Sequence, residues 1–245
     1  MTIAGHIGPA GSAPGRPDLE PVPGFEALGV IAFTTTRARG DFALDSREPA
    51  RDVFGRWQGL MDMLSPHATR LAFARQVHGD RVLLHEGGWS GWMRATDADA
   101  HVTLAPATAL AVTVADCVPV FLAHPTGAVA VVHSGWRGTV AKVASRAVQR
   151  LVEAGAPAHE LHAHCGPSIC GGCYEVSSEV YAELTGRAVA APTPVDLRAL
   201  IADDLRAAGV RDISISPWCT RCDNTRFYSH RCGDAGRQVG VIARI

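Results

Sequence analysis

Three residues in this sequence carry side chains that suit a transition-metal site, and each lies at the end of a strand-like run. His78 follows an apolar run that ends at Val77, Cys117 follows the run 109–115, and His133 follows the run 128–132. A thiolate with two imidazoles binds Zn²⁺ or copper better than Mg²⁺ or Ca²⁺. Three protein ligands leave a fourth position for water, as is typical of a catalytic zinc. The sequence therefore indicates a metal centre formed by His78, Cys117 and His133.

Spacing alone leaves two other interpretations of these residues open. Cys117 is equally compatible with a small core residue, and the two histidines with surface loops. A third interpretation makes Cys117 a nucleophile and His133 its base, because an adjacent imidazole lowers the pKa of a thiol. Copurification of a metal would separate the metal centre from this metal-free Cys–His site. Asp116 and Glu175 are the candidates for a general acid or base.

The segment Ser134–Gly138 precedes an expected helix over 139–152. Glycines before a helix N-terminus expose backbone N–H groups toward an anion, and the guanidinium of Arg137 is a bidentate donor. A phosphate or carboxylate site at Ser134, Gly135 and Arg137 is therefore expected, with Arg231 and Arg237 as further contacts. An ordinary strand-to-helix turn is the alternative.

Four of the seven cysteines form two Cys-x-x-Cys pairs, Cys170 with Cys173 and Cys219 with Cys222. Paired motifs of this kind occur in structural zinc sites. The separation of the pairs is longer than in a compact zinc ribbon, so ordinary reduced cysteines are the alternative. The odd cysteine count argues against a full disulfide framework.

The hydrophobic pattern predicts an irregular mixture of strands and helices. Strands are expected over 28–36, 70–77, 81–85, 161–164, 213–215 and 238–245, besides the runs around Cys117 and before His133. Helices are expected over 49–64, 139–152, 177–185 and 196–208. Residues 78–80 are expected to form a hairpin turn, and 86–97 a loop. This irregular order favours an α+β or layered α/β sandwich over a Rossmann sheet.

Length and composition bound the function classes. The chain has 245 residues and a net charge of −1, with 47% hydrophobic residues. We expect a disordered leader over 1–24 and a single domain over 25–245. The charge balance favours neither a nucleic-acid nor a membrane partner, and no export signal or membrane span is expected. A cytoplasmic protein with reduced thiols is the expectation.

Five segments together resemble the signatures of one family, in the same order along the chain. They are Arg75–Gly79, Thr113–Val120, Val132–Gly138, Cys165–Cys170 and Phe227–Arg231. The family is the multicopper polyphenol oxidase (laccase-like) family, also called the purine nucleoside phosphorylase YfiH family and the peptidoglycan editing factor family. The resemblance covers the chain from about residue 70 to the C-terminus.

The resemblance implies a fold, a metal site and an activity. The implied fold is a layered α/β/β/α sandwich with mixed sheets, similar to the cytotoxic necrotising factor class. The implied metal ligands are His78, Cys117 and His133, with zinc usually named and copper in the older laccase label. The implied reactions are phosphorolysis of adenosine, inosine, guanosine and methylthioadenosine, and deamination of adenosine. The small-molecule partners would then be a purine nucleoside and phosphate.

The first quarter of the chain departs from the family pattern. Arg37 matches an arginine of the family and is a further candidate for binding phosphate, but a glycine and an asparagine that usually follow have no counterpart. Two other activities therefore stay open. One is a copper-dependent laccase, although the histidines include no His-x-His pair except His162 with His164. The other is a Cys–His hydrolase that edits peptidoglycan precursors.

Overall fold

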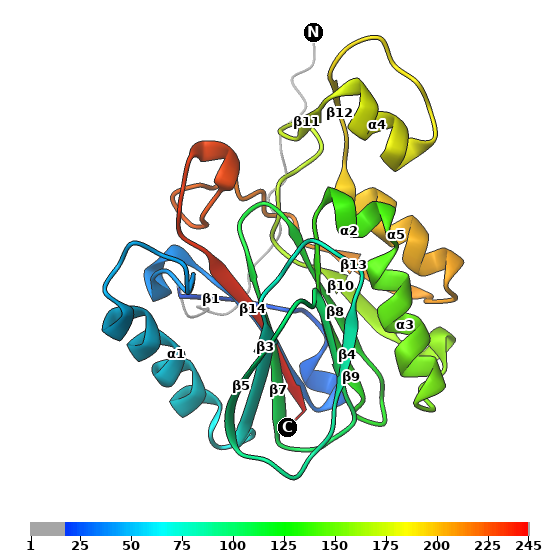
Figure 1. Ribbon diagram of the computed structural model, residues 1–245. Coiled ribbons are helices and arrows are strands. Elements are labelled where there is room, and N and C mark those ends of the chain that lie inside the picture. The colour runs from blue at the N-terminus through cyan, green and yellow to red at the C-terminus, as the bar shows by residue number, and fades with distance from the viewer. Residues whose placement is uncertain (1–17, 245) are drawn as a thin grey trace, which may run out of the picture.

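Two sheets packed face to face form the frame of the protein, and helices cover both outer faces (Figure 1). The computed structural model describes residues 18–244. Within them the first sheet has six strands, in the spatial order β1 (Leu19–Pro21), β2 (Val30–Thr35), β14 (Gln238–Arg244), β7 (Thr108–Val114), β3 (Arg70–Ala74) and β5 (Gly91–Ala95).

The second sheet has six strands among the same residues. Their spatial order is β13 (Asp212–Ile215), β10 (His162–Cys165), β8 (Val118–Ala123), β9 (Val129–Ser134), β6 (Ala100–Thr103) and β4 (Val82–His85). Both sheets mix parallel with antiparallel pairs. A separate small ribbon joins β11 (Glu175–Val176) to β12 (Thr193–Pro194).

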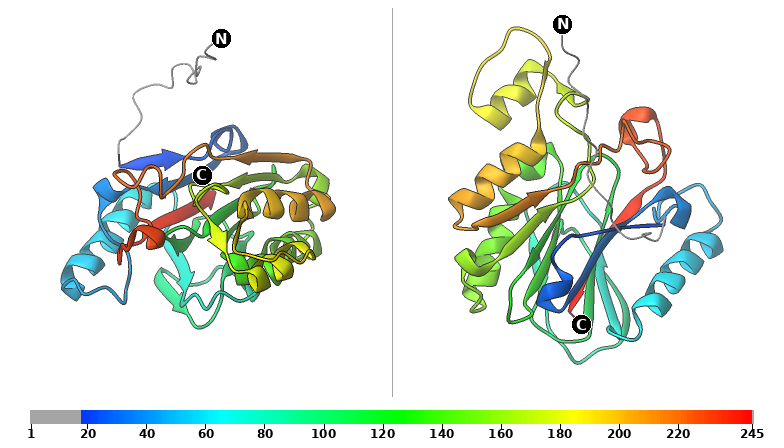
Figure 2. Two further views of the ribbon diagram at one scale, coloured as in Figure 1. Left: turned by 90° about the horizontal axis from the view of Figure 1, so that it is seen from above. Right: turned by 180° about the vertical axis from the view of Figure 1, so that it is seen from behind.

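Helices complete the outer layers, as the view from above also shows (Figure 2). Helix α1 (Ala50–Leu64) covers the first sheet, and α2 (Trp136–Val140), α3 (Val143–Glu153) and α5 (Leu197–Ala207) lie beside the second. Helix α4 (Ser178–Thr185) follows β11. Short 3₁₀ turns occupy Glu26–Leu28, Arg37–Arg39, Ala158–Glu160 and His230–Cys232.

Strict alternation along the strands produces three layers of core. In β7, Ala109 and Ala111 face helix α1, whereas Leu110 and Val112 face the other sheet. Successive strand residues point to opposite faces, so a strand buried on both faces must be apolar throughout. The continuous apolar runs on either side of Cys117 follow from that burial. The expected α/β/β/α sandwich is confirmed.

Several local predictions were wrong. The segments 70–77 and 81–85 do not form a hairpin, because β3 pairs with β5 and β7 in one sheet and β4 pairs with β6 in the other. The expected loop 86–97 contains strand β5. The expected leader 1–24 includes β1, which pairs with β2; residues 1–17 lie outside the described part.

The helix expected over 139–152 is two helices. Lys142 separates α2 from α3 and has a left-handed backbone, with φ of 61°. Its ammonium group pairs with Asp204 of α5, a partner 62 residues away. The apolar periodicity over 139–152 also predicts that Val152 faces inward, but Val152 is exposed, one residue before the end of α3.

The described residues include no helix with both the length and the hydrophobicity needed to cross a bilayer.

Candidate metal centre

The three predicted ligands meet because the chain crosses from one sheet to the other next to His78 and again next to Cys117. His78 lies where the chain leaves β3 of one sheet for β4 of the other, and Cys117 lies between β7 and β8, which also belong to different sheets. His133 is the penultimate residue of β9, whose neighbour is β8. Crossings at the same end of the sandwich therefore bring together residues that are far apart in the sequence.

The donor atoms form a compact group. One ligand atom each from His78, Cys117 and His133 lies within 4.8 Å of the others. The two imidazole rings are 4.7 Å apart between centroids and nearly perpendicular. His78 and Asp116, the residue before Cys117, have φ of 59° and 78°. Residues other than glycine rarely adopt this left-handed region of the backbone. Such conformations persist only where the surrounding structure holds them.

Asp99 organises this group. Its buried carboxylate accepts a hydrogen bond from His133 Nδ1 at 2.8 Å, and from the backbone N–H groups of Val77, His78 and Gly79 at 3.2, 3.0 and 2.8 Å. The bond to Nδ1 leaves Nε2 of His133 free to bind a metal, as metal-ligating histidines usually require. The three N–H bonds fix the unusual backbone of His78. Asp99 was not among the predicted site residues, because nothing local in the run Ala98–Ala100 distinguishes it.

Two further residues shape the centre. The Gln76 side chain accepts from the N–H of Thr113 at 2.8 Å and donates to its carbonyl at 2.7 Å, which ties the turn before His78 to β7. Gly135 lies behind the ligands, where an added Cβ would be 2.8 Å from Cys117 Sγ and 3.3 Å from the His78 ring. Any residue with a Cβ at position 135 would therefore collide with the Cys117 sulfur.

The charges of the ligands suit a metal. Burial by itself would raise the pKa of Cys117, but His133 and His78 outweigh it and lower that pKa to about 6. Burial likewise would lower the pKa of His133, but the Cys117 thiolate and Asp99 raise it to about 9. Cys117 and His133 therefore form a thiolate–imidazolium pair when no metal is bound. The donor set fits a soft divalent ion, for which the thiolate is already available.

Asp116 holds Cys117 in place. One carboxylate oxygen accepts from the Thr220 hydroxyl at 2.6 Å and the other from the Arg231 N–H at 2.7 Å. Its backbone carbonyl accepts from the Ile169 N–H at 3.0 Å. Both oxygens are thus engaged within the fold, which favours a positioning role over the acid or base role expected for Asp116. Glu175, the other candidate, is exposed on β11.

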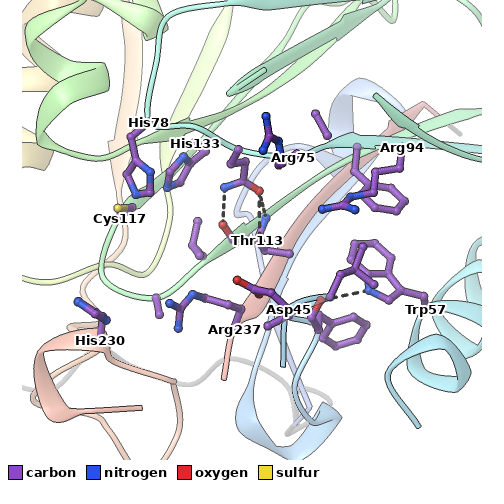
Figure 3. Close-up of a pocket in the computed structure, with 18 residues that line it drawn as sticks. Asp45, Trp57, Arg75, His78, Arg94, Thr113, Cys117, His133, His230 and Arg237 are labelled. Carbon is purple, nitrogen blue, oxygen red and sulfur yellow. Dashed lines mark hydrogen bonds between the residues drawn. The ribbon is translucent and has the colours of Figure 1, made fainter. Parts of the chain in front are cut away.

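A cavity of about 430 Å³ opens beside the three ligands. Figure 3 shows the ligands at one end, Trp57 and Arg94 at the other, and Thr113 between them. Phe42 and Phe73 join Trp57 in an aromatic wall, and the Trp57 and Phe73 rings stack 4.4 Å apart.

Cationic groups also line this cavity. They are Arg75, Arg94 and Arg237, and the imidazole of His230 lies beside them in the lining. Arg75 pairs with Asp97, whereas the guanidinium of Arg94, on β5, makes no hydrogen bond or ion pair with residues 18–244. A cavity of this size, with arginines in its lining and three ligands at one end, can hold a polar heterocycle with an anion.

The predicted anion contacts are placed differently. Arg37 donates to the carbonyls of Asn224 and Phe227 and pairs with Asp234. Ser134 is buried, and its hydroxyl bonds that of Thr139. The polar atoms of both residues are therefore already used within the fold.

Arg137 and Arg231 lie outside the cavity lining but close to the ligands. Arg231 stands over the Tyr174 ring, 5.1 Å from its centroid, and donates to the Glu175 carbonyl. Arg137 stands 4.2 Å over the Trp136 ring. Burial and the charge of Cys117 raise the pKa of Tyr174 to about 12, and both arginines oppose this rise. Arg137 and Arg231 therefore lie near Cys117. With Tyr174 they form a second cationic group, which we call the Tyr174 group. Helix α2, which follows Gly135, has only five residues.

The sequence matches a family model over residues 34–245, nearly the whole chain. The model is described as multi-copper polyphenol oxidoreductase laccase. This chain belongs to that family. The match includes His78, Cys117 and His133.

Three comparisons with individual proteins agree with this membership. The chain is 36% identical over 252 residues to a purine nucleoside phosphorylase of Deinococcus radiodurans, covering 94% of both chains. It is 36% identical to adenosine deaminase RL5 from an unknown prokaryotic organism, over 83% of this chain and 88% of that one. The structure of YlmD from Geobacillus stearothermophilus superimposes with a TM-score of 0.82 at 26% identity, over 88% of this chain and 92% of that one.

Proposed function

We propose that this protein is a metal-dependent purine nucleoside enzyme. Its reactions would be phosphorolysis of adenosine, inosine, guanosine and methylthioadenosine, and deamination of adenosine. The observation that carries the proposal is the three-donor centre at one end of a cavity of about 430 Å³ with aromatic and cationic walls. The names of the related phosphorylase and deaminase support the same reactions.

We propose zinc as the metal, held by Cys117 Sγ and one nitrogen each of His78 and His133. Bound zinc would supply a Lewis acid and lower the pKa of water at its open position. Neither reaction needs a change of oxidation state, which favours zinc over copper. Reduced thiols are needed for this centre, so we also propose a cytoplasmic location.

The residues of the chain would divide the work of binding. The purine would lie in the cavity between the three ligands and the buried aromatic cluster of Phe42, Trp57 and Phe73. Arg94 and Arg237 line the same cavity and would receive phosphate. Nη1 of Arg237 already donates to the carbonyls of Asp234, Ala235 and Gly236, so its Nε and Nη2 would face the anion. Asp99 would keep His133 oriented, and Gly135 would leave room beside the sulfur.

The bond changes of both reactions are simple. In phosphorolysis a phosphate oxygen attacks C1′ of the ribose, and the C1′–N9 bond breaks with its electron pair leaving on the purine. The purine takes up a proton, and ribose 1-phosphate and the free base are released. In deamination, water adds to C6 of adenosine, a proton moves to the amino group, and ammonia leaves to give inosine.

Product analysis tests this function. Adenosine is incubated with the purified protein, with and without phosphate, and adenine, ribose 1-phosphate and inosine are quantified. We expect all three with phosphate and only inosine without it, and a loss of at least 100-fold in Cys117→Ala. Cys232→Ala is the matched control, because Cys232 is exposed. It belongs neither to the centre at Cys117 nor to the group formed by the two Cys-x-x-Cys pairs. Absence of all three products from folded, metal-loaded protein would refute the proposal.

The phosphate contacts have their own test. Arg237→Ala should raise the KM for phosphate while changing deamination little. Arg231→Ala serves as the comparison, because it removes a cation of the Tyr174 group instead. If only Arg231→Ala raised the KM for phosphate, the phosphate would have to bind at the Tyr174 group instead of Arg237.

A second candidate is a metal-free Cys–His hydrolase. The observation that favours it is the series Cys117, His133 and Asp99, in which the thiol has a lowered pKa and the imidazole is oriented by a carboxylate. Such an enzyme would hydrolyse an amide or ester through a thioester on Cys117: the amine or alcohol leaves with a proton from His133, and water then releases the acid and restores the thiol. Chelation separates the candidates: the hydrolase would keep its activity without metal and lose it on alkylation of Cys117.

A further inference from the structure

The two Cys-x-x-Cys pairs, which play no part in the proposed activity, meet in space. Cys170 and Cys173 follow β10, and Cys219 and Cys222 follow β13. Strands β10 and β13 pair in parallel, so both loops leave the sheet at the same end. A further bridge between Ser168 and Cys219 continues that pairing into the loops. The topology therefore brings together two motifs that are 49 residues apart.

The four sulfurs have the spacing of a tetrahedral metal site. All four Sγ atoms lie within 4.8 Å of one another, and those of Cys173 and Cys222 are 3.5 Å apart. Four sulfurs bound to zinc at about 2.3 Å in a tetrahedron lie about 3.8 Å from one another. A disulfide would require about 2.05 Å. All seven cysteines are free thiols in this structure.

The backbone around the sulfurs suits thiolates. The N–H groups of Cys170 and Cys222 point at the Cys219 sulfur, at 3.3 and 3.4 Å. Both loops turn back on themselves: the Cys173 N–H donates to the Cys170 carbonyl at 3.0 Å, and the Asp223 N–H donates to the Cys219 carbonyl at 2.8 Å. Arg221 bridges the two loops by donating to the Cys173 carbonyl at 3.2 Å. These contacts orient the side chains of both loops toward one point.

We propose that Cys170, Cys173, Cys219 and Cys222 bind a zinc ion that has a structural role. Four protein sulfurs fill a tetrahedral shell and leave no position for water or substrate, unlike the centre at Cys117. The protein would then bind two zinc ions of different kinds, one catalytic and one structural.

This second zinc would support the first centre indirectly. The clamped loops carry Thr220, whose hydroxyl holds the Asp116 carboxylate, and Ile169, whose N–H holds the Asp116 carbonyl. Asp116 in turn fixes the backbone from which Cys117 projects. Loss of the structural zinc should therefore loosen the Cys117 centre without removing any of its ligands.

The test is zinc analysis of full-length protein purified in reducing buffer without metal-affinity resin. We expect about two zinc ions per chain in the wild type, one in the double variant C173S/C222S, and two in the control Cys232→Ser. The double variant should also lower the melting temperature, a readout independent of nucleoside turnover. A wild-type content of one zinc, lost in Cys117→Ala and kept in C173S/C222S, would overturn the proposal.

Cobalt substitution covers the case in which the double variant does not fold. Wild-type protein is stripped of metal and titrated with Co²⁺, and the sulfur-to-cobalt charge-transfer absorption is followed. Two equivalents should bind, and one should absorb with about four times the intensity of the other, because it has four thiolates rather than one. A titration that ends at one equivalent, or mass analysis of unreduced native protein that finds disulfides Cys173–Cys222 or Cys170–Cys219, would refute the site.

Discussion

The substitution Asp99→Asn tests how far one buried carboxylate organises the metal centre. An asparagine has the same shape, but it carries no charge and replaces one acceptor oxygen by an NH₂ group. The Asp99 oxygens accept four hydrogen bonds, one from His133 Nδ1 and three from backbone N–H groups. At least one of those donors must then face another donor.

The expected magnitude follows from these contacts. Removing the partner of a metal-bound histidine costs roughly 10- to 100-fold in metal affinity, or about 1.4 to 2.7 kcal/mol. Leaving a buried donor unpaired costs a further 1 to 3 kcal/mol or so in the free energy of unfolding. Asp99→Asn should therefore weaken metal binding at Cys117 and also lower the stability of the protein.

The assay reads Cys117 directly. Bound zinc protects the thiolate from alkylation, so the fraction of alkylated Cys117 is followed by peptide mass spectrometry at increasing chelator concentration. Asp97→Asn is the matched control, because Asp97 is two residues away, exposed and paired with Arg75. The reasoning would be refuted by a folded Asp99→Asn protein in which the fraction of alkylated Cys117, at each chelator concentration, lies within twofold of both wild type and control.

Three further predictions concern the same centre. Gly135→Ala should abolish metal protection of Cys117, because the added Cβ would lie 2.8 Å from its sulfur; Gly59→Ala, in an open helical position, should bind metal normally and raise stability by up to about 1 kcal/mol. In metal-free protein, alkylation of Cys117 should rise with pH around a midpoint near 6, because the folded thiol is ionised above that value. His133→Ala should raise the midpoint, because burial is then opposed only by His78 among the groups that act on that pKa; an unchanged midpoint would contradict the ion pair. Thr220→Val removes a buried donor to the carboxylate before Cys117, and should lower the unfolding free energy in urea by about 1 to 3 kcal/mol; no change would mean that this hydrogen bond contributes nothing.

Much of this protein could be predicted from local pattern. Apolar runs around Cys117 and before His133 predicted buried strands, and β8 and β9 are indeed buried throughout. The periodicity of α1 predicted a helix, because Val53, Trp57 and Leu64 recur on one face. Periodicity of this kind depends only on residues within a few positions of each other, so it is visible within a single strand or helix.

Side-chain type also determined the candidate ligands. His78, Cys117 and His133 stood out because thiolates and imidazoles at strand ends have few other reasons to be there. The two Cys-x-x-Cys motifs stood out for the same reason, although their separation argued against one shared site. Donor chemistry is a property of the residue, so it can be seen before the fold is known.

Only the tertiary structure decided how these parts meet. Strands β3 and β4 look like a hairpin but enter different sheets, because sheet membership depends on partners far along the chain. Asp99 looks like any aspartate, and its role exists only because three N–H groups and His133 converge on it. The parallel pairing of β10 with β13 joins the two cysteine motifs. Local sequence fixes which groups are present, whereas their distances are set by long-range pairing whose free energy is shared over the whole core.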